Sequence, residues 1–112
     1  MKNKHCIVEI LIQNDHIQIL INQNYSCSTI YYEGIVYSVL GNIDKAIECF
    51  NHSLEINEFQ SHALYRRALA YYNKNDYENA LRDINAAENL GLQTDECKAL
   101  HKKIVDKFDM GM

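Results

Sequence analysis

Hydrophobic residues in the middle of the chain recur at intervals of three and four positions, the spacing that gathers them on one face of an α-helix. In a first stretch this pattern joins Ile30, Gly34 and Tyr37, and a break follows at Gly41 and Asn42. The pattern resumes in a second stretch at Ile43, Ala46, Ile47, Phe50, Ser53 and Leu54. We therefore expect two amphipathic helices joined by a short turn.

The same arrangement returns 34 positions later in the chain. The identical pairs at this spacing are Tyr31 with Tyr65, Tyr37 with Tyr71, Ala46 with Ala80 and Asn51 with Asn85. Where identity is lost, the size class is kept, because Gly34 aligns with Ala68 and Phe50 with Ile84. Two stacked copies of one helical hairpin need this conservation of size, since small residues allow helices to approach and large ones fill the gaps.

These residues resemble the tetratricopeptide repeat, in which a large residue, a small one and an aromatic one precede an Ala-x-x-x-Phe segment and a closing proline. The pattern is met by Ile30, Gly34, Tyr37, Ala46 and Phe50 in the first copy, and by Leu64, Ala68, Tyr71, Ala80 and Ile84 in the second. The resemblance implies an all-α fold, with antiparallel helical hairpins stacked as a short superhelix. Its repeats would occupy residues 27–60 and 61–94.

The chain contains no proline and only four glycines, which favours long helices with short connections. Glu58 and Leu92 stand where the family closes its hairpins with proline. We therefore expect the second helices to run on past Ile56 and Leu90, and the chain to form one continuous solenoid.

The segments that flank the repeats are expected to cap them, because two hairpins leave apolar end faces uncovered. Residues 95–109 predict a capping helix in which Thr94 is the N-cap and the acidic pair Asp95 and Glu96 favours the helix start. Its apolar stripe would comprise Cys97, Leu100, Ile104 and Phe108. Residues 1–26 fit either a helix or a β-hairpin around Asn14 and Asp15. We favour a capping helix there, because a hairpin would leave strand edges unpaired.

Composition and charge narrow the function classes. The 112 residues, 47% hydrophobic and 23% charged, indicate a single globular domain. No apolar run is long enough to predict a membrane span or a signal peptide, so we expect a cytoplasmic protein. The net charge of −4 argues against general nucleic-acid binding. All three arginines lie after residue 60, and we expect Arg67 and Arg82 to point outward or to pair with carboxylates such as Glu78 and Asp83.

The sequence carries no recognisable catalytic or cofactor motif. Glycine-rich phosphate loops are absent, and the histidines fall at unrelated places. The four cysteines are spread singly, which predicts neither a zinc site nor a disulfide framework. We therefore expect no enzyme activity, no metal and no cofactor.

In tetratricopeptide arrays the first helix of each hairpin lines a concave side that binds partners. The resemblance places on that side Tyr31, Tyr32, Ile35 and Ser38 from the first copy, and His62, Tyr65, Arg66, Leu69 and Tyr72 from the second. Tyrosine and arginine are common at binding hot spots, because they bury a large area and keep a polar group. The alternative is that several of these tyrosines only fill gaps between repeats.

Residues 62–68 also resemble a segment of the chaperone-adaptor branch of the family, including immunophilins. There a lysine and an arginine four residues later clamp the acidic, carboxylate-ended tails of heat-shock chaperones. Here Arg66 matches the arginine, but His62 replaces the lysine and Tyr32 replaces an asparagine. The clamp implied by the resemblance is therefore incomplete.

Two lysines of the capping helix offer a second pair of cations. They are Lys98 and Lys102. If Leu100 and Ile104 pack as Leu64 and Ala68 do, these lysines lie where His62 and Arg66 lie in the preceding repeat. The four side chains then form a cationic row along the groove. The alternative is that they only keep an end helix soluble.

The sequence thus predicts a protein-interaction module that binds a peptide or partner surface in its concave groove. A narrower hypothesis is that the ligand is an acidic or carboxylate-terminated chaperone tail. The second hypothesis is a structural protein that associates with its own copies, since two repeats are few for an independent array.

Overall fold

The structure is a computed structural model that describes residues 27–110, so the prediction made for residues 1–26 lies outside the described residues. Five helices and no strand occupy this described part, which confirms the all-α fold. The helices are α3 (Cys27–Val39), α4 (Ile43–Ile56), α5 (Ser61–Asn73), α6 (Tyr77–Asn89) and α7 (Asp95–Met110).

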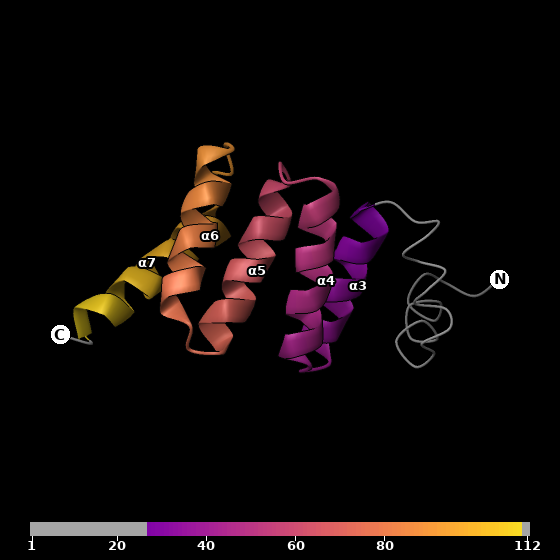
Figure 1. The fold of residues 1–112 in the computed structure, drawn as a ribbon. Coiled ribbons are helices and arrows are strands. Elements are labelled where there is room, and N and C mark those ends of the chain that lie inside the picture. The colour runs from indigo at the N-terminus through magenta and orange to yellow at the C-terminus, as the bar shows by residue number, and fades with distance from the viewer. Residues whose placement is uncertain (1–26, 111–112) are drawn as a thin grey trace.

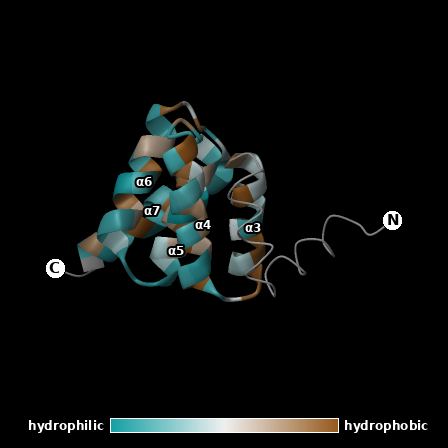
Figure 2. Cartoon of the chain, turned by 45° about the vertical axis from the view of Figure 1, so that its right-hand side comes forward, coloured by the Kyte–Doolittle hydropathy of each residue, from teal (hydrophilic) through white to brown (hydrophobic). Residues whose placement is uncertain are grey.

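The helices pack in chain order as a solenoid. Helices α3 and α4 form one hairpin and α5 and α6 the next, while α4 packs on α5 and α6 on α7. Figure 1 shows this succession from α3 at one end to α7 at the other. The first helices also meet one another, because α3 contacts α5 and α5 contacts α7. Figure 2 shows both apolar and polar residues within the helices of the array.

The turns inside both hairpins combine a residue of positive φ with an N-cap residue for the next helix. Two residues after the ends of α3 and α5 stand residues with positive φ, Gly41 (86°) and Asn75 (66°), as a left-handed helix cap requires. The next residue in each turn, Asn42 or Asp76, is the N-cap of the following helix, and its side chain accepts a hydrogen bond from a backbone N–H three residues on. The breaks predicted from the sequence are therefore confirmed, with the same 34-residue spacing.

The prediction that the second helices run on past Ile56 and Leu90 is wrong, because α4 ends at Ile56 and α6 at Asn89. After α6, Gly91 adopts φ 100°, its N–H donates to Glu88 O, and the Leu92 N–H donates to Ala87 O. This cap satisfies the last carbonyls and turns the chain without proline. The chain leaves α4 differently, through an extended Asn57 with φ −147° and ψ 105°.

The capping helix α7 forms largely as predicted. The Thr94 hydroxyl oxygen accepts a hydrogen bond from the Cys97 backbone N–H at 3.2 Å, which confirms the N-cap. Cys97, Leu100 and Ile104 are buried, but Phe108 is 41% exposed, so the predicted stripe is one residue too long. The stripe ends early because the facing helix α6 starts at Tyr77 and offers no further surface.

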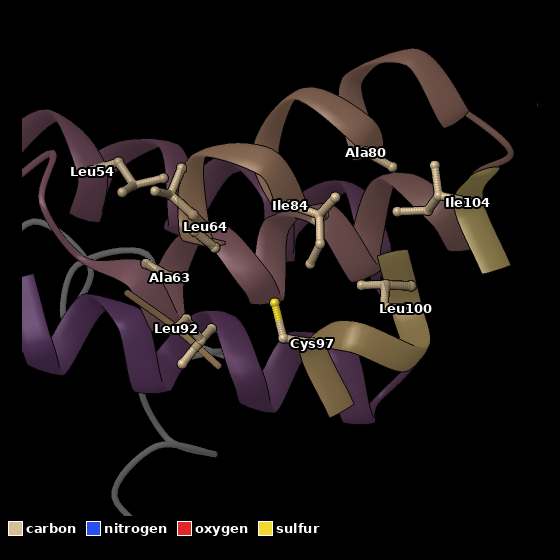
Figure 3. Packing of buried hydrophobic residues seen from close by; sticks show 11 residues of the cluster. Leu54, Ala63, Leu64, Ala80, Ile84, Leu92, Cys97, Leu100 and Ile104 are labelled. Atoms are coloured by element: carbon tan, nitrogen blue, oxygen red, sulfur yellow. The ribbon is translucent and has the colours of Figure 1, made fainter. Parts of the chain in front are cut away.

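The buried apolar residues form two clusters. A smaller one fills the first hairpin with Ile30, Tyr37, Ala46, Cys49 and Phe50. The larger one runs from the end of α4 to α7 and includes Leu54, Ala63, Leu64, Ala68, Ala80, Ile84, Ala87, Leu92, Cys97, Leu100 and Ile104. Figure 3 shows side chains of this cluster gathered between the helices. Burial continuous across the repeats is what lets hairpins that are unstable alone hold together.

A half-buried arginine joins three helices. Arg67 on α5 donates two hydrogen bonds to the Asp83 carboxylate on α6, at 2.7 and 2.8 Å, and a third to Asn51 Oδ1 on α4, at 2.8 Å. The Asp83 side chain is 5% exposed and the Arg67 side chain 22%. The hydrogen bond to Asp83 raises the pKa of the guanidinium, which stays charged. The predicted pairing of Arg67 with Asp83 is thus confirmed, whereas Arg82 is exposed.

Replacing Arg67 should destabilise the fold by about 3–5 kcal/mol, because Arg67→Leu leaves the Asp83 carboxylate buried without its cation. Chemical denaturation followed by far-UV circular dichroism measures the loss. Arg82→Leu is the matched control on an exposed site and should change the unfolding free energy little. Equal stabilities of the two variants would contradict the role assigned to Arg67.

Close approach of α3 and α4 depends on Gly34. A Cβ at this position would lie 2.6 Å from Cε1 and 2.9 Å from Cδ1 of the Phe50 ring. The ring is fully buried, so it has little room to move. In the second hairpin the equivalent pair is Ala68 and Ile84, both also fully buried. The larger side chain of Phe50 is therefore accommodated by the smaller residue opposite it, Gly34.

Gly34→Ala should lower stability by about 1–2 kcal/mol, since overpacking outweighs the better helix propensity of alanine. Adding Phe50→Ile recreates the pair of the second hairpin and should recover part of that loss. Unfolding curves of the two single variants and the double variant measure the coupling. Strictly additive effects would contradict a direct contact between these positions.

Candidate partner-binding pocket

A pocket of about 530 Å³ lies where α3 faces α5 across the connection between the two hairpins. Its walls are Ser28, Tyr31, Tyr32 and Ile35 from α3, Phe59 and Gln60 from the connection, and Ser61, His62, Ala63 and Arg66 from α5. The pocket arises because each first helix places one face toward the neighbouring first helix while its other face packs on α4 or α6.

The pocket brings together five of the residues predicted for the groove: Tyr31, Tyr32, Ile35, His62 and Arg66. On α3, Tyr31 is half-buried against Phe50, with ring centroids 6.0 Å apart, and meets Tyr32 edge-on at 5.2 Å. On α5, His62 and Arg66 stand one helical turn apart on the same face. Tyr32 and His62 are exposed, so they form part of the rim.

Three other predicted residues do not line the pocket. Tyr65, Leu69 and Tyr72 are half-buried and pack against the larger core cluster. Burial raises the pKa of Tyr65 and keeps its phenol neutral. For these side chains the structure favours the alternative that they fill gaps between helices. Ser38, near the end of α3, also lies outside the lining.

The two lysines predicted to extend the groove also lie outside the pocket lining, and both are exposed on α7. Leu100 and Ile104 on α7 are buried, as Leu64 and Ala68 on α5 are. Binding by Lys98 and Lys102 stays a prediction.

The sequence analysis missed the contribution of the connection, residues 57–60. Phe59 is 70% exposed on the pocket rim, although aromatic residues this exposed are uncommon. The equivalent residue in the next connection is Gln93, so comparison of the two connections was the signal that could have found it.

Hydrogen bonds fix the shape of this connection. The Gln60 amide donates to the carbonyl oxygens of Ser53 and Asn57, both at 2.7 Å. The Ser53 hydroxyl lies within hydrogen-bonding distance of the Cys27 carbonyl oxygen (2.8 Å) and of Gln60 Oε1 (3.1 Å). Asn57 Oδ1 accepts a hydrogen bond from the Phe59 backbone N–H at 3.1 Å. The end of α4, the start of α3 and the connection are thereby held together.

The chemistry of the lining suits recognition of an anion beside an apolar group. None of the lining residues named above is a carboxylate, while Arg66 supplies a positive charge and a planar set of donors. Its guanidinium carbon lies 5.9 Å from the centre of the Tyr65 ring, which helps to hold its orientation. The opposite wall is aromatic and aliphatic.

The described residues offer little for covalent or metal chemistry. Within residues 27–110, no group of three or more His, Cys, Asp or Glu side chains is placed to hold a metal ion. Burial, together with the nearby Glu33, raises the pKa of the Cys49 thiol, which donates a hydrogen bond to Glu33 Oε1 at 3.4 Å. Burial likewise raises the pKa of Cys97. Both thiols therefore stay protonated and weakly nucleophilic at neutral pH.

Comparison with known proteins identifies the repeats. The family model of the tetratricopeptide repeat matches residues 33–60 and 61–90. The chain belongs to the tetratricopeptide repeat family. The repeats of this family indicate a protein–protein interaction module, as the sequence predicted.

Two curated proteins are similar over parts of the chain. One is a DnaJ homolog subfamily C member 3 homolog from Dictyostelium discoideum, 46% identical over 43 residues, which are 38% of this chain and 9% of the relative. The other is a tetratricopeptide repeat protein 30 homolog from Caenorhabditis briggsae, 36% identical over 53 residues, 47% of this chain and 8% of the relative. The matched segments thus span less than a tenth of either relative.

None of the helices α3 to α7 has the length and apolar character needed to cross a membrane.

Gln60→Ala should loosen the connection, because it removes two hydrogen bonds donated to carbonyl oxygens. We expect a loss of about 1–2 kcal/mol in unfolding free energy and faster amide hydrogen exchange at Phe59. Gln93→Ala, at an exposed position of the second connection, is the control and should change neither quantity. Unchanged exchange at Phe59 in Gln60→Ala would show that these bonds do not hold the connection.

Proposed function

We propose that this tetratricopeptide repeat protein binds a peptide segment of a partner protein in the pocket between α3 and α5, with a carboxylate of the peptide paired to Arg66. The observation that carries the proposal is the composition of this pocket. It sets the side chains of Arg66 and His62 beside exposed aromatic surface, and none of its named lining residues is acidic.

Charge explains why the ligand is an acidic peptide. A carboxylate entering the pocket gains hydrogen bonds to a guanidinium whose position is already restrained by the Tyr65 ring. A basic ligand would instead meet like charge without a compensating carboxylate. The proposed ligand therefore carries a free carboxyl terminus or an Asp or Glu side chain.

The resemblance to chaperone adaptors supports a narrower form of this proposal, in which the ligand is an acidic, carboxylate-terminated chaperone tail. His62 in place of lysine and Tyr32 in place of asparagine leave only Arg66 from the set that the resemblance implies. Anchoring by one arginine favours weaker binding than a complete clamp provides, and it makes the apolar contacts of the pocket more important.

Self-association is the second candidate function. It is favoured by the exposed apolar residues Val105 (37%) and Phe108 (41%) on α7, the last helix that the structure describes. Sedimentation at tens of micromolar distinguishes the two candidates. A monomer at that concentration leaves the peptide-binding proposal as the one to pursue.

Arg66→Ala should weaken binding of a peptide ending in Glu-Glu-Val-Asp by about tenfold to a hundredfold, the effect of losing one or two charge-assisted hydrogen bonds. Fluorescence anisotropy of the labelled peptide measures the affinity. His62→Lys should strengthen binding, and added salt should weaken it in the wild-type protein.

Arg82→Ala is the matched control, because Arg82 is exposed on α6 and outside the pocket lining. Amidating the peptide and replacing its acidic side chains with amides should abolish binding by the wild-type protein. Undetectable binding of the acidic peptide at millimolar concentration, or equal affinities of Arg66→Ala and Arg82→Ala, would remove the proposal.

A further inference from the structure

His62 is the second basic side chain of the pocket lining. It is exposed near the start of α5, and Arg66 follows it one helical turn later on the same face. Side chains at this spacing have Cβ atoms about 5–6 Å apart. One bound carboxylate, or two neighbouring ones, can therefore pair with both residues at once.

The two basic groups respond differently to pH. A guanidinium stays charged throughout the neutral range, whereas histidine is the side chain that ordinarily changes its charge between pH 5 and 8. A protonated imidazole donates from both ring nitrogens and carries a positive charge, while a neutral one donates from a single nitrogen. The pocket therefore combines a permanent cation, Arg66, with one whose charge depends on pH, His62.

The groups that share the pocket with His62 include no carboxylate among the described residues of the lining. The other titratable groups there are the phenols of Tyr31 and Tyr32 on α3 and the guanidinium of Arg66. The charged residue of α3, Glu33, is buried and accepts a hydrogen bond from the Cys49 thiol. The facing helix thus offers His62 hydroxyl and aromatic groups rather than a negative charge.

Carboxylates on the other elements packed against α5 lie outside the lining. Glu55 at the end of α4 and Glu58 in the connection are exposed to solvent. On α6, Asp83 is buried in its ion pair. On α7, Glu96 is exposed and contributes to the raised pKa of Tyr65, whose main cause is burial. Within the described part of the chain, the counter-charge for a protonated His62 is therefore left to the ligand.

We infer that His62 makes ligand binding in this pocket depend on pH, because a bound carboxylate favours the protonated imidazole and the peptide therefore binds with uptake of a proton. Two cations one helical turn apart repel each other, and a carboxylate beside them offsets that repulsion. Linkage then requires the affinity to rise as the pH falls through the range in which histidine titrates, and to be lost as the pH rises through it. The inference rests on the proposed function and adds to it the control of the same site by pH.

Fluorescence anisotropy of the labelled Glu-Glu-Val-Asp peptide at about pH 5.5 and about pH 8 tests this inference, since the carboxylates of the peptide stay largely ionised over that interval. We expect the wild-type protein to bind about tenfold more tightly at the lower pH, the effect of adding one charge-assisted hydrogen bond. His62→Gln should lose this dependence and keep the weaker affinity at both pH values. His62→Lys should bind tightly at both.

His52→Gln is the matched control, because His52 is half-buried on α4 and lies outside the pocket lining. It should keep the tenfold response. Calorimetric titrations at about pH 6.5, in two buffers that differ in ionisation enthalpy, should show proton uptake on peptide binding by the wild-type protein and none by His62→Gln. Far-UV circular dichroism establishes that each variant is folded at both pH values.

The outcomes separate this inference from the function on which it rests. Binding that depends on Arg66 but changes less than about twofold between the two pH values, or a pH response that persists in His62→Gln, overturns the role of His62 alone. Absence of binding by the wild-type protein at both pH values overturns both. Tighter binding at the higher pH would show that the neutral imidazole is the bound form, and it overturns the inference as well.

Discussion

The hydrogen bonds of Arg67 link the second hairpin to the first. Its guanidinium is the donor to Asp83 within its own hairpin and to Asn51 on the preceding helix α4, so three helices meet at one side chain. Charge-assisted bonds restrict both distance and angle more than apolar contacts do. Because α5 also carries His62 and Arg66, the orientation of the pocket wall relative to α4 depends on this residue.

Both repeats place a polar contact between the two helices of the hairpin, but with different side chains. The positions of Arg67 and Asp83 are occupied in the first repeat by Glu33 and Cys49, which are hydrogen-bonded at 3.4 Å. A buried polar contact between the two helices of the hairpin is thus kept, while its chemistry changes from an ion pair to a thiol donor and a carboxylate acceptor. The backbone geometry of a repeat therefore constrains where a polar pair lies more than which pair is used.

The two repeats also differ at the proposed binding pocket. The first connection presents Phe59 at the pocket rim, whereas the second presents Gln93. The second connection turns on Gly91 and buries Leu92 in the core, while the first is held by Asn57 and the side chain of Gln60. A regular solenoid needs neither an exposed phenylalanine nor its supporting bonds, and their presence beside Arg66 is consistent with a binding surface.

The sequence by itself determined the helices, their hairpin turns and the repeat family, because apolar period, positive-φ residues and N-caps are local properties. It also identified Tyr31, Tyr32, Ile35, His62 and Arg66 as pocket residues, since their positions on the helix faces determine which way they point.

Tertiary structure decided what the local pattern cannot determine. Tyr65, Leu69 and Tyr72 pack against the larger buried cluster, and the two lysines of α7 lie outside the pocket lining. The helix ends predicted from missing prolines were wrong, because an extended Asn57 and a left-handed Gly91 stop a helix equally well. The place of Phe59 depends on side-chain hydrogen bonds within residues 53–60, which the period of apolar positions does not predict.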